Sequence, residues 1–135
     1  MLNKLDNELL AKAVQIIKDR YVEGSLNHTV GCALRDKSGN IHLGINLDMD
    51  GMHSVCAEQV AFGNALTNGI KEFDTVVAVG LFDGKISVLA PCGSCRQFMS
   101  KYASNIKVVI DDNGDLKSVK FDKLLPHAYK LHVDR

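Results

Sequence analysis

Apolar residues recur at intervals of three and four from Leu2 to about Tyr21, and charged or amide side chains fill the positions between them. This spacing puts the apolar side chains on one face of an α-helix, so it predicts an amphipathic helix that packs on a core. Asn3 or Asp6 could cap its start, because a short polar side chain there can accept a hydrogen bond from the first turn. The apolar positions of this helix are Leu5, Leu9, Leu10, Ala13, Val14, Ile16 and Ile17.

Extended segments follow once the helical pattern breaks at residues 24–27. Residues 29–34 and 41–47 are expected to pair as antiparallel strands, because turn-forming residues 36–40 separate them. The continuous apolar run 75–81 is typical of a strand that is buried on both faces. Further segments are a short strand or extended lead at 85–89, strands at 106–110 and 116–121, and helices at 56–68 and after Cys92. Such alternation indicates the α/β class, with helices covering a mixed sheet.

Length and charge narrow the class of protein further. The chain has 135 residues, a length that favours one domain over residues 1–135. It carries equal numbers of basic and acidic side chains, 16 of each. No basic run interleaved with aromatic residues is present, so we expect no binding to nucleic acid. The first 20 residues carry charges throughout, and no apolar run approaches membrane-spanning length. We therefore expect a cytoplasmic protein that does not bind membranes.

Three cysteines and one glutamate have the spacing of a metal site. Cys92 and Cys95 precede a helix-forming run, so both sulfurs can point at one spot from the first turn of a helix. Cys56 also opens a predicted helix, and the partial positive charge at two helix N-termini favours thiolate over thiol. Glu58 stands two residues after Cys56 and can move the protons of a zinc-bound water without binding the metal itself. This pattern predicts a catalytic zinc with three protein ligands and one open position.

Other interpretations of Cys92 and Cys95 are a structural zinc site and a redox pair. A structural zinc needs a fourth protein ligand, for which His53 is the nearest spare donor. A redox pair would leave the other cysteine and the glutamate of the motif without a role. Four cysteines could also form two disulfides, although a Cys-x-x-Cys pair without an export signal more often indicates metal or redox chemistry. The fourth cysteine, Cys32, lies in a strand of small residues and is expected to be a buried, inert thiol.

The segment 91–95, Pro-Cys-Gly-Ser-Cys, together with Cys56-Ala57-Glu58, resembles the zinc motif of the cytidine deaminase family. The resemblance is to the short branch with three cysteine ligands, which includes cytidine deaminase and blasticidin S deaminase, and it extends over residues 30–34, 44–48 and 124–129. It implies a three-layer α-β-α sandwich with a mixed five-stranded sheet. It also implies one zinc ion per chain, held by the three cysteines, and a homotetramer.

The resemblance further implies residues that contact the substrate. Asn46 and Asp48, in the segment before Cys56, match a segment that hydrogen-bonds ribose hydroxyls, although polar residues at a strand end are also typical of a turn. His28 occupies the place of an aromatic residue beside the base, with a solvated loop histidine as the alternative. Tyr129 matches an aromatic residue that packs over a neighbouring subunit's pocket, with a tyrosine at the core edge as the alternative. Backbone groups that orient the ring are expected near Ala57 and Ala90.

Two polar residues next to the motif differ in how they fit the family. Gln59 stands where members of this branch commonly have an arginine that offsets the negative charge of three thiolates. Arg96, which directly follows Cys95, could compensate by donating a hydrogen bond to a sulfur. A solvated surface arginine is the alternative interpretation.

The reaction implied is hydrolytic deamination of a cytosine nucleoside, cytidine or deoxycytidine, with Glu58 as the proton shuttle. Asp48 favours an ordinary nucleoside, because blasticidin S deaminase lacks an acid at this place. One alternative is deamination of a modified aminopyrimidine nucleoside antibiotic such as blasticidin S. An alternative of another class is a noncatalytic zinc-binding module, which would not need Glu58. A small-molecule pyrimidine nucleoside is thus the expected partner.

Overall fold

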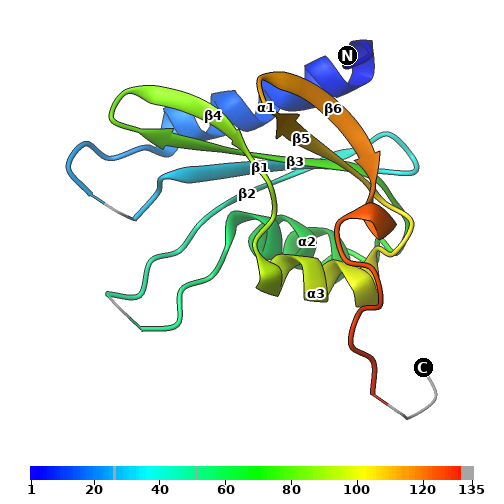
Figure 1. Cartoon of the computed structure of the whole chain (residues 1–135). Coiled ribbons are helices and arrows are strands. Elements are labelled where there is room, and N and C mark those ends of the chain that lie inside the picture. The colour runs from blue at the N-terminus through cyan, green and yellow to red at the C-terminus, as the bar shows by residue number, and fades with distance from the viewer. Residues whose placement is uncertain (26, 51, 132–135) are drawn as a thin grey trace.

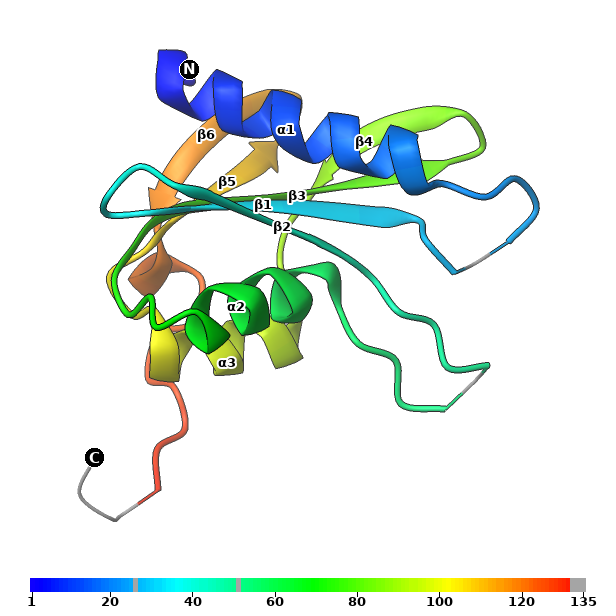
Figure 2. The same cartoon turned by 180° about the vertical axis from the view of Figure 1, so that it is seen from behind.

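A mixed β-sheet forms the middle of three layers, with α1 on one face and α2 and α3 on the other (Figures 1 and 2). The computed structural model describes residues 1–25, 27–50 and 52–131. Leu26 in the predicted break, Gly51 before Cys56, and the end of the predicted domain, 132–135, lie outside the described residues. The helices and strands are α1 Lys4–Arg20, β1 Val30–Asp36, β2 Ile41–Ile45, α2 Ala57–Thr67, β3 Phe73–Phe82, β4 Lys85–Leu89, α3 Gly93–Tyr102, β5 Lys107–Asp112 and β6 Asp115–Lys120, followed by the 3-10 turn η1 Phe121–Lys123.

The described part of the sheet has six strands, in the order β2-β1-β3-β5-β6 with β4 paired to β3. One edge of the ten-residue β3 pairs with β1, whereas its other edge pairs with β5 near its start and with β4 near its end. Asp83 and Gly84 both have positive φ, 50° and 75°, and this two-residue turn folds β4 back onto β3. The predicted three layers and mixed sheet are confirmed. The predicted number of five strands is wrong, because residues 85–89 form a full strand.

Successive residues of β1 and β3 face opposite helical layers, as the period of a strand requires. Ala33, Val77 and Val79 pack with α1, whereas Cys32 and Val76 pack with α2 and α3. The continuous apolar run of β3 is therefore buried on both faces, as predicted. The residues of α1 that lie in the hydrophobic core between this helix and the sheet are Leu9, Ala13 and Ile17.

Polar contacts fix the start of α1 against the sheet. Asn3 caps the helix, since its Oδ1 accepts a hydrogen bond from the backbone N–H of Asp6 at 2.8 Å. Arg35 of β1 donates to Asp6 Oδ1 at 3.1 Å and to Asp74 Oδ2 at 2.8 Å, and the side chains of Arg35 and Asp6 are buried. Burial raises the pKa of Asp74, but the hydrogen bonds from Arg35 and Thr75 outweigh it and hold this pKa below its ordinary value. Across residues 1–25, 27–50 and 52–131, no helix has both the length and the apolarity needed to span a bilayer.

Candidate active site

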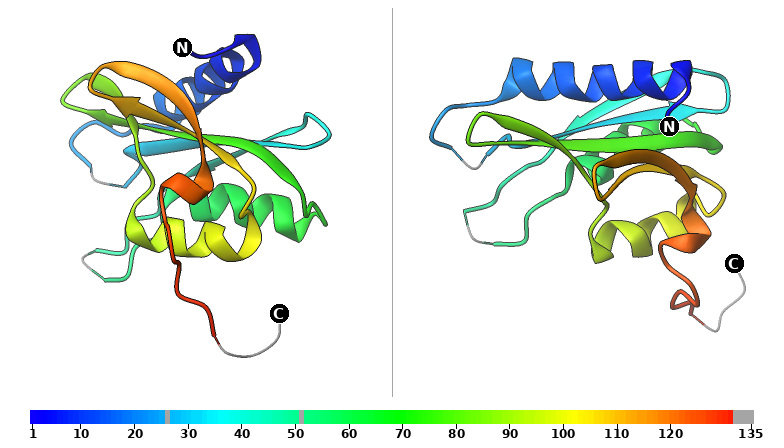
Figure 3. Two further views of the ribbon diagram at one scale, coloured as in Figure 1. Left: turned by 45° about the vertical axis from the view of Figure 1, so that its right-hand side comes forward. Right: turned by 45° about the horizontal axis from the view of Figure 1, so that its top comes forward.

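The first turns of α2 and α3 lie next to each other under the sheet (Figure 3). Cys56 is the N-cap residue of α2 and Cys92 is the N-cap residue of α3, each with an extended backbone conformation. Cys95 is the third residue of α3 and is fully buried. The structure thus brings the three predicted ligands together at two neighbouring helix N-termini.

The three sulfurs have the separation that tetrahedral zinc requires. All three lie within 4.8 Å of one another, and the Sγ atoms of Cys56 and Cys92 are 3.7 Å apart. Two ligands of a tetrahedral ion with bonds of about 2.3 Å are about 3.8 Å apart, so the group fits zinc. All four cysteines are free thiols, which excludes the disulfide framework in this structure. His53 is not in this group of potential ligands, so within the described residues the group has three members and no fourth ligand.

The electrostatics of the group favour a bound cation. Burial raises the pKa of Cys92, but the other two thiols and the nearby backbone N–H groups of Cys95 and Ser94 outweigh it, so the net pKa is lowered. Burial raises the pKa of Cys56 and of Cys95, and the neighbouring negative charges raise both further. Three thiolates this close repel one another, and a divalent cation between them removes that cost.

Glu58 lies in the first turn of α2 and is only 7% exposed. It lines a small apolar gap together with Ala78, Leu89 and Pro91. Burial raises the pKa of its carboxyl group above the ordinary value. Its charge also raises the pKa of Cys95, and it shares the first turn of α2 with the N-cap residue Cys56 without being one of the clustered ligands. A buried, non-ligating carboxyl group at this place is suited to proton transfer.

Gly44 of β2 lets the first turn of α2 lie directly on the sheet. A Cβ atom at position 44 would be 2.4 Å from the carbonyl oxygen of Ala57 and 2.5 Å from the backbone nitrogen of Ala61. Both neighbours are backbone atoms of the helix, so no side-chain rotation could relieve the overlap. Gly44 therefore sets the distance between the sheet and the turn that carries Glu58.

His28 and Asn46 lie together, just before the start of β1 and just after the end of β2. The Oδ1 atom of Asn46 accepts hydrogen bonds from the backbone N–H groups of Thr29 and Val30, both at 2.9 Å. The carbonyl oxygen of Asn46 can only accept, so His28 Nδ1, 3.0 Å away, carries the proton and leaves Nε2 as the free ring nitrogen. The side-chain oxygen of Asn46 thus holds the chain before β1, and its Nδ2 group, 3.4 Å from the Thr29 hydroxyl, is the part with remaining donor capacity.

Asp48 lies in the segment that leads from β2 to α2. An isolated bridge between Leu47 and Val55 closes this segment just before Cys56. The carboxylate of Asp48 accepts from the backbone N–H of Asp50 at 3.2 Å and from the Ser54 hydroxyl at 3.4 Å. These are contacts within the loop, and both are long, so the carboxylate retains acceptor capacity.

Polar residues of α3 hold the segments on either side of it. Arg96 donates from Nε to the carbonyl oxygen of Pro91 at 2.7 Å and from Nη1 to that of Leu124 at 2.9 Å. The hydrogen bond to a sulfur that the sequence suggested for Arg96 is replaced by these bonds to backbone carbonyls. Gln97 donates to the carbonyl oxygen of Tyr129 at 2.9 Å, while the tyrosine itself is 69% exposed. Tyr129 therefore does not close an edge of this chain's own core.

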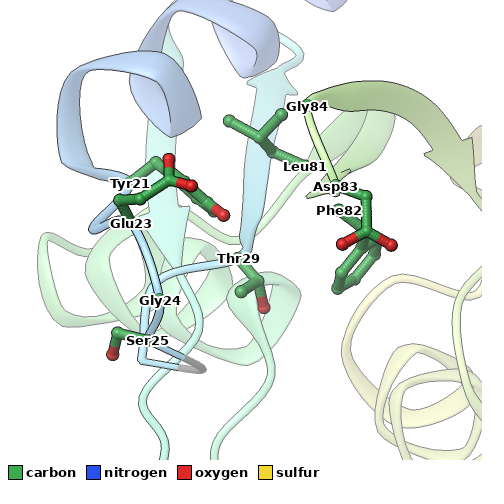
Figure 4. A pocket seen from close by; sticks show the side chains of 9 residues that line it. All are labelled: Tyr21, Glu23, Gly24, Ser25, Thr29, Leu81, Phe82, Asp83 and Gly84. Carbon is green, nitrogen blue, oxygen red and sulfur yellow. The ribbon is translucent and has the colours of Figure 1, made fainter.

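A cavity of about 740 Å³ opens between the loop after α1 and the turn that joins β3 to β4 (Figure 4). Thr29 lies between the two loops, and Phe82 and Asp83 line the other side. The lining contains none of the three sulfur ligands and not Glu58. The cavity is therefore separate from the group of sulfurs, and among its lining residues Thr29 donates a backbone hydrogen bond to Asn46.

Comparison with known proteins identifies the class to which this fold and site belong. Residues 3–111 match the family model described as the cytidine and deoxycytidylate deaminase zinc-binding region. The chain belongs to this family of zinc-dependent deaminases, which are hydrolases, and its zinc site is the all-cysteine type formed by Cys56, Cys92 and Cys95.

Among particular relatives, blasticidin-S deaminase from Bacillus cereus is 37% identical over 134 residues, covering 95% of this chain and 94% of the relative. Cytidine deaminase from Sporosarcina psychrophila is 31% identical over 125 residues, covering 90% and 89%. The crystal structure of cytidine deaminase from Burkholderia pseudomallei superposes with a TM-score of 0.74 at 28% identity, covering 95% of this chain and all of that chain. The predicted family and fold are confirmed.

Proposed function

We propose that this protein catalyses the zinc-dependent hydrolysis of the 4-amino group of a cytosine nucleoside, with cytidine and deoxycytidine as its first candidate substrates. The observation that supports this most is the buried carboxyl group of Glu58 in the helical turn that Cys56 begins. A zinc-binding module without catalysis has no use for such a group, because burying a carboxyl group costs stability unless it is compensated.

The chain's own residues hold the zinc and move the protons. Zinc bound by Cys56, Cys92 and Cys95 supplies a Lewis acid that lowers the pKa of a water to about 7, which yields a nucleophile at neutral pH. Glu58 accepts one proton from the attacking water at a carboxylate oxygen and returns it to N3 as the oxygen adds to C4. Glu58 then passes the remaining hydroxyl proton to the amino nitrogen, the C4–N bond breaks, and ammonia leaves. One water is consumed and Glu58 ends as a carboxylate.

Substrate orientation is assigned to five residues outside the metal ligands. Nδ2 of Asn46 and the carboxylate of Asp48 would bind the sugar hydroxyls, and His28 would lie beside the base. Backbone groups of Ala57 and Ala90 would orient the ring. The remaining donor of Asn46 and the remaining acceptor capacity of Asp48 are compatible with these roles.

A modified aminopyrimidine nucleoside such as blasticidin S is the second candidate substrate. The 37% identity to blasticidin-S deaminase from Bacillus cereus over nearly the whole chain supports it. Both candidates use the same chemistry at C4, so the difference lies in what the pocket accepts beyond the pyrimidine ring.

A substrate panel, followed by loss of the ultraviolet band of the aminopyrimidine, tests the choice. We expect turnover of cytidine and deoxycytidine.

A variant tests the role of Asp48. We expect Asp48→Ala to raise KM for cytidine about tenfold with a smaller change in kcat, since one charge-assisted hydrogen bond is lost. Asp19→Ala on the exposed side of α1 is the matched control and should leave KM unchanged. An unchanged KM in Asp48→Ala, or turnover of blasticidin S alone, would instead support the second candidate.

We also propose one zinc ion per chain and a homotetramer. Tyr129 and Leu131 in the C-terminal segment are 69% and 51% exposed, so two large apolar side chains are uncovered in the single chain. Light scattering should give a mass near four times the 14.8 kDa chain, and metal analysis should give one zinc per chain. A fully active monomer would contradict the assembly, because Tyr129 could not then cover a neighbouring pocket.

A further inference from the structure

We propose that Gln59 and Ser94 form a clasp that positions the two zinc-binding helices relative to each other. Nε2 of Gln59 on α2 donates a hydrogen bond to Oγ of Ser94 on α3 at 3.0 Å. Gln59 directly follows Glu58, and Ser94 directly precedes Cys95. Among the described residues, it is the one hydrogen bond between the side chains of α2 and α3, apart from the contact between the sulfurs of their N-cap residues Cys56 and Cys92.

The clasp is the middle contact of three that run along the two helices. The first contact is between Cys56 and Cys92, whose sulfurs are 3.7 Å apart. The third is between the rings of Phe62 and Phe98, packed edge to face with centroids 5.4 Å apart. Residues 56, 59 and 62 follow one another at intervals of three, just under one helical turn, so each is the neighbour of the next along α2. The hydrogen bond therefore lies between the sulfurs and the aromatic contact.

The two helices differ in how firmly they are held. The first turn of α2 lies directly on the sheet at Gly44, with Ala57 and Ala61 fully buried. In the first turn of α3, by contrast, Gly93 and Ser94 are exposed, and Cys95 is the buried residue. The clasp thus ties the exposed turn of α3 to the anchored turn of α2. Its role is positioning, because neither side chain is a metal ligand.

The rate at which zinc leaves the protein tests this. Zinc-loaded Gln59→Ala and Ser94→Ala variants are mixed with a chromogenic chelator, and zinc transfer is followed with time. We expect release to be about three- to tenfold faster in each variant, the range for one lost hydrogen bond. The double variant should be no faster than either single variant, because each removes the same bond. Ser94→Thr keeps the hydroxyl group and should release zinc at the wild-type rate.

Ser100→Ala is the matched control on α3, because the Ser100 hydroxyl donates only within its own helix, to the carbonyl oxygen of Gln97. Release within twofold of wild type in both clasp variants would overturn the proposal, as would additive effects in the double variant. A lower Tm with unchanged release would also overturn it, since that is the effect of a merely structural bond. The inference rests on zinc binding alone, so its failure would leave the proposed deamination, measured by turnover of cytidine, unaffected.

Discussion

Glu58→Gln is expected to lower kcat by about a hundred- to ten-thousandfold while the zinc content stays at the wild-type level. The amide has nearly the same size and can still accept a hydrogen bond, but it cannot take up and return a proton. The reaction needs that group twice, once to activate the water and once to protonate the departing nitrogen. Zinc should remain because Glu58 is outside the group of clustered sulfurs. The measurement is deamination rate and zinc content on the same preparation.

Glu72→Gln is the matched control, since Glu72 is an exposed glutamate between α2 and β3 and should keep full activity. More than about a tenth of the wild-type rate in Glu58→Gln would overturn the proton-shuttle mechanism. Loss of zinc from that variant would mean that Glu58 belongs to the metal shell.

Cys95→Ala is expected to abolish both zinc binding and activity. Losing an outer-shell partner of a metal ligand already weakens metal affinity by about 10- to 100-fold, so losing a direct ligand should cost more. Two thiols would remain, and they cannot supply the three protein ligands that a catalytic zinc uses. Metal analysis after gel filtration, together with the deamination rate, measures the effect.

Cys32→Ala is the control for that experiment. Cys32 is as fully buried as Cys95 and carries the same thiol, but it lies on β1 and outside the sulfur group. Both substitutions remove a buried sulfur from the core, so both should change stability in the same way. Only Cys95→Ala should also lose zinc. Retention of zinc in Cys95→Ala, or equal loss in Cys32→Ala, would contradict the assignment of the ligands.

The elements could be predicted because their signals are local. The repeat of apolar residues in α1 and the continuous apolar run of β3 depend only on neighbouring positions. The sixth strand was missed as a full member of the sheet because β4 is short and largely exposed, so its burial pattern is weak. The Asp83-Gly84 pair was the available signal for the hairpin, and its two positive φ angles explain why the strand pairs fully.

Two pairs within the motif, Cys92 with Cys95 and Cys56 with Glu58, could be recognised locally, since helix geometry sets what residues two or three apart can reach. The meeting of Cys56 with Cys92, 36 residues away, was implied by the family resemblance. The contacts of the surrounding polar residues were not. Arg96 reaches the carbonyl oxygen of Leu124, and Gln59 reaches Ser94, which has no signal of its own inside the motif. The side-chain oxygen of Asn46 accepts a hydrogen bond from the backbone N–H of Thr29. These partners are 17 to 35 residues apart in sequence, so only the packing of whole elements decides them.

The contact at Gly44 has a consequence for protein engineering. Because β2 and the first turn of α2 touch through backbone atoms, the turn that carries Glu58 is supported directly by the sheet. Under the proposed function, libraries that vary positions 28 and 48 can therefore search for new nucleoside preferences with this support left intact, whereas Asn46 also holds the backbone before β1. Position 44 should be excluded from such libraries, since every other amino acid there forces the catalytic helix off its support.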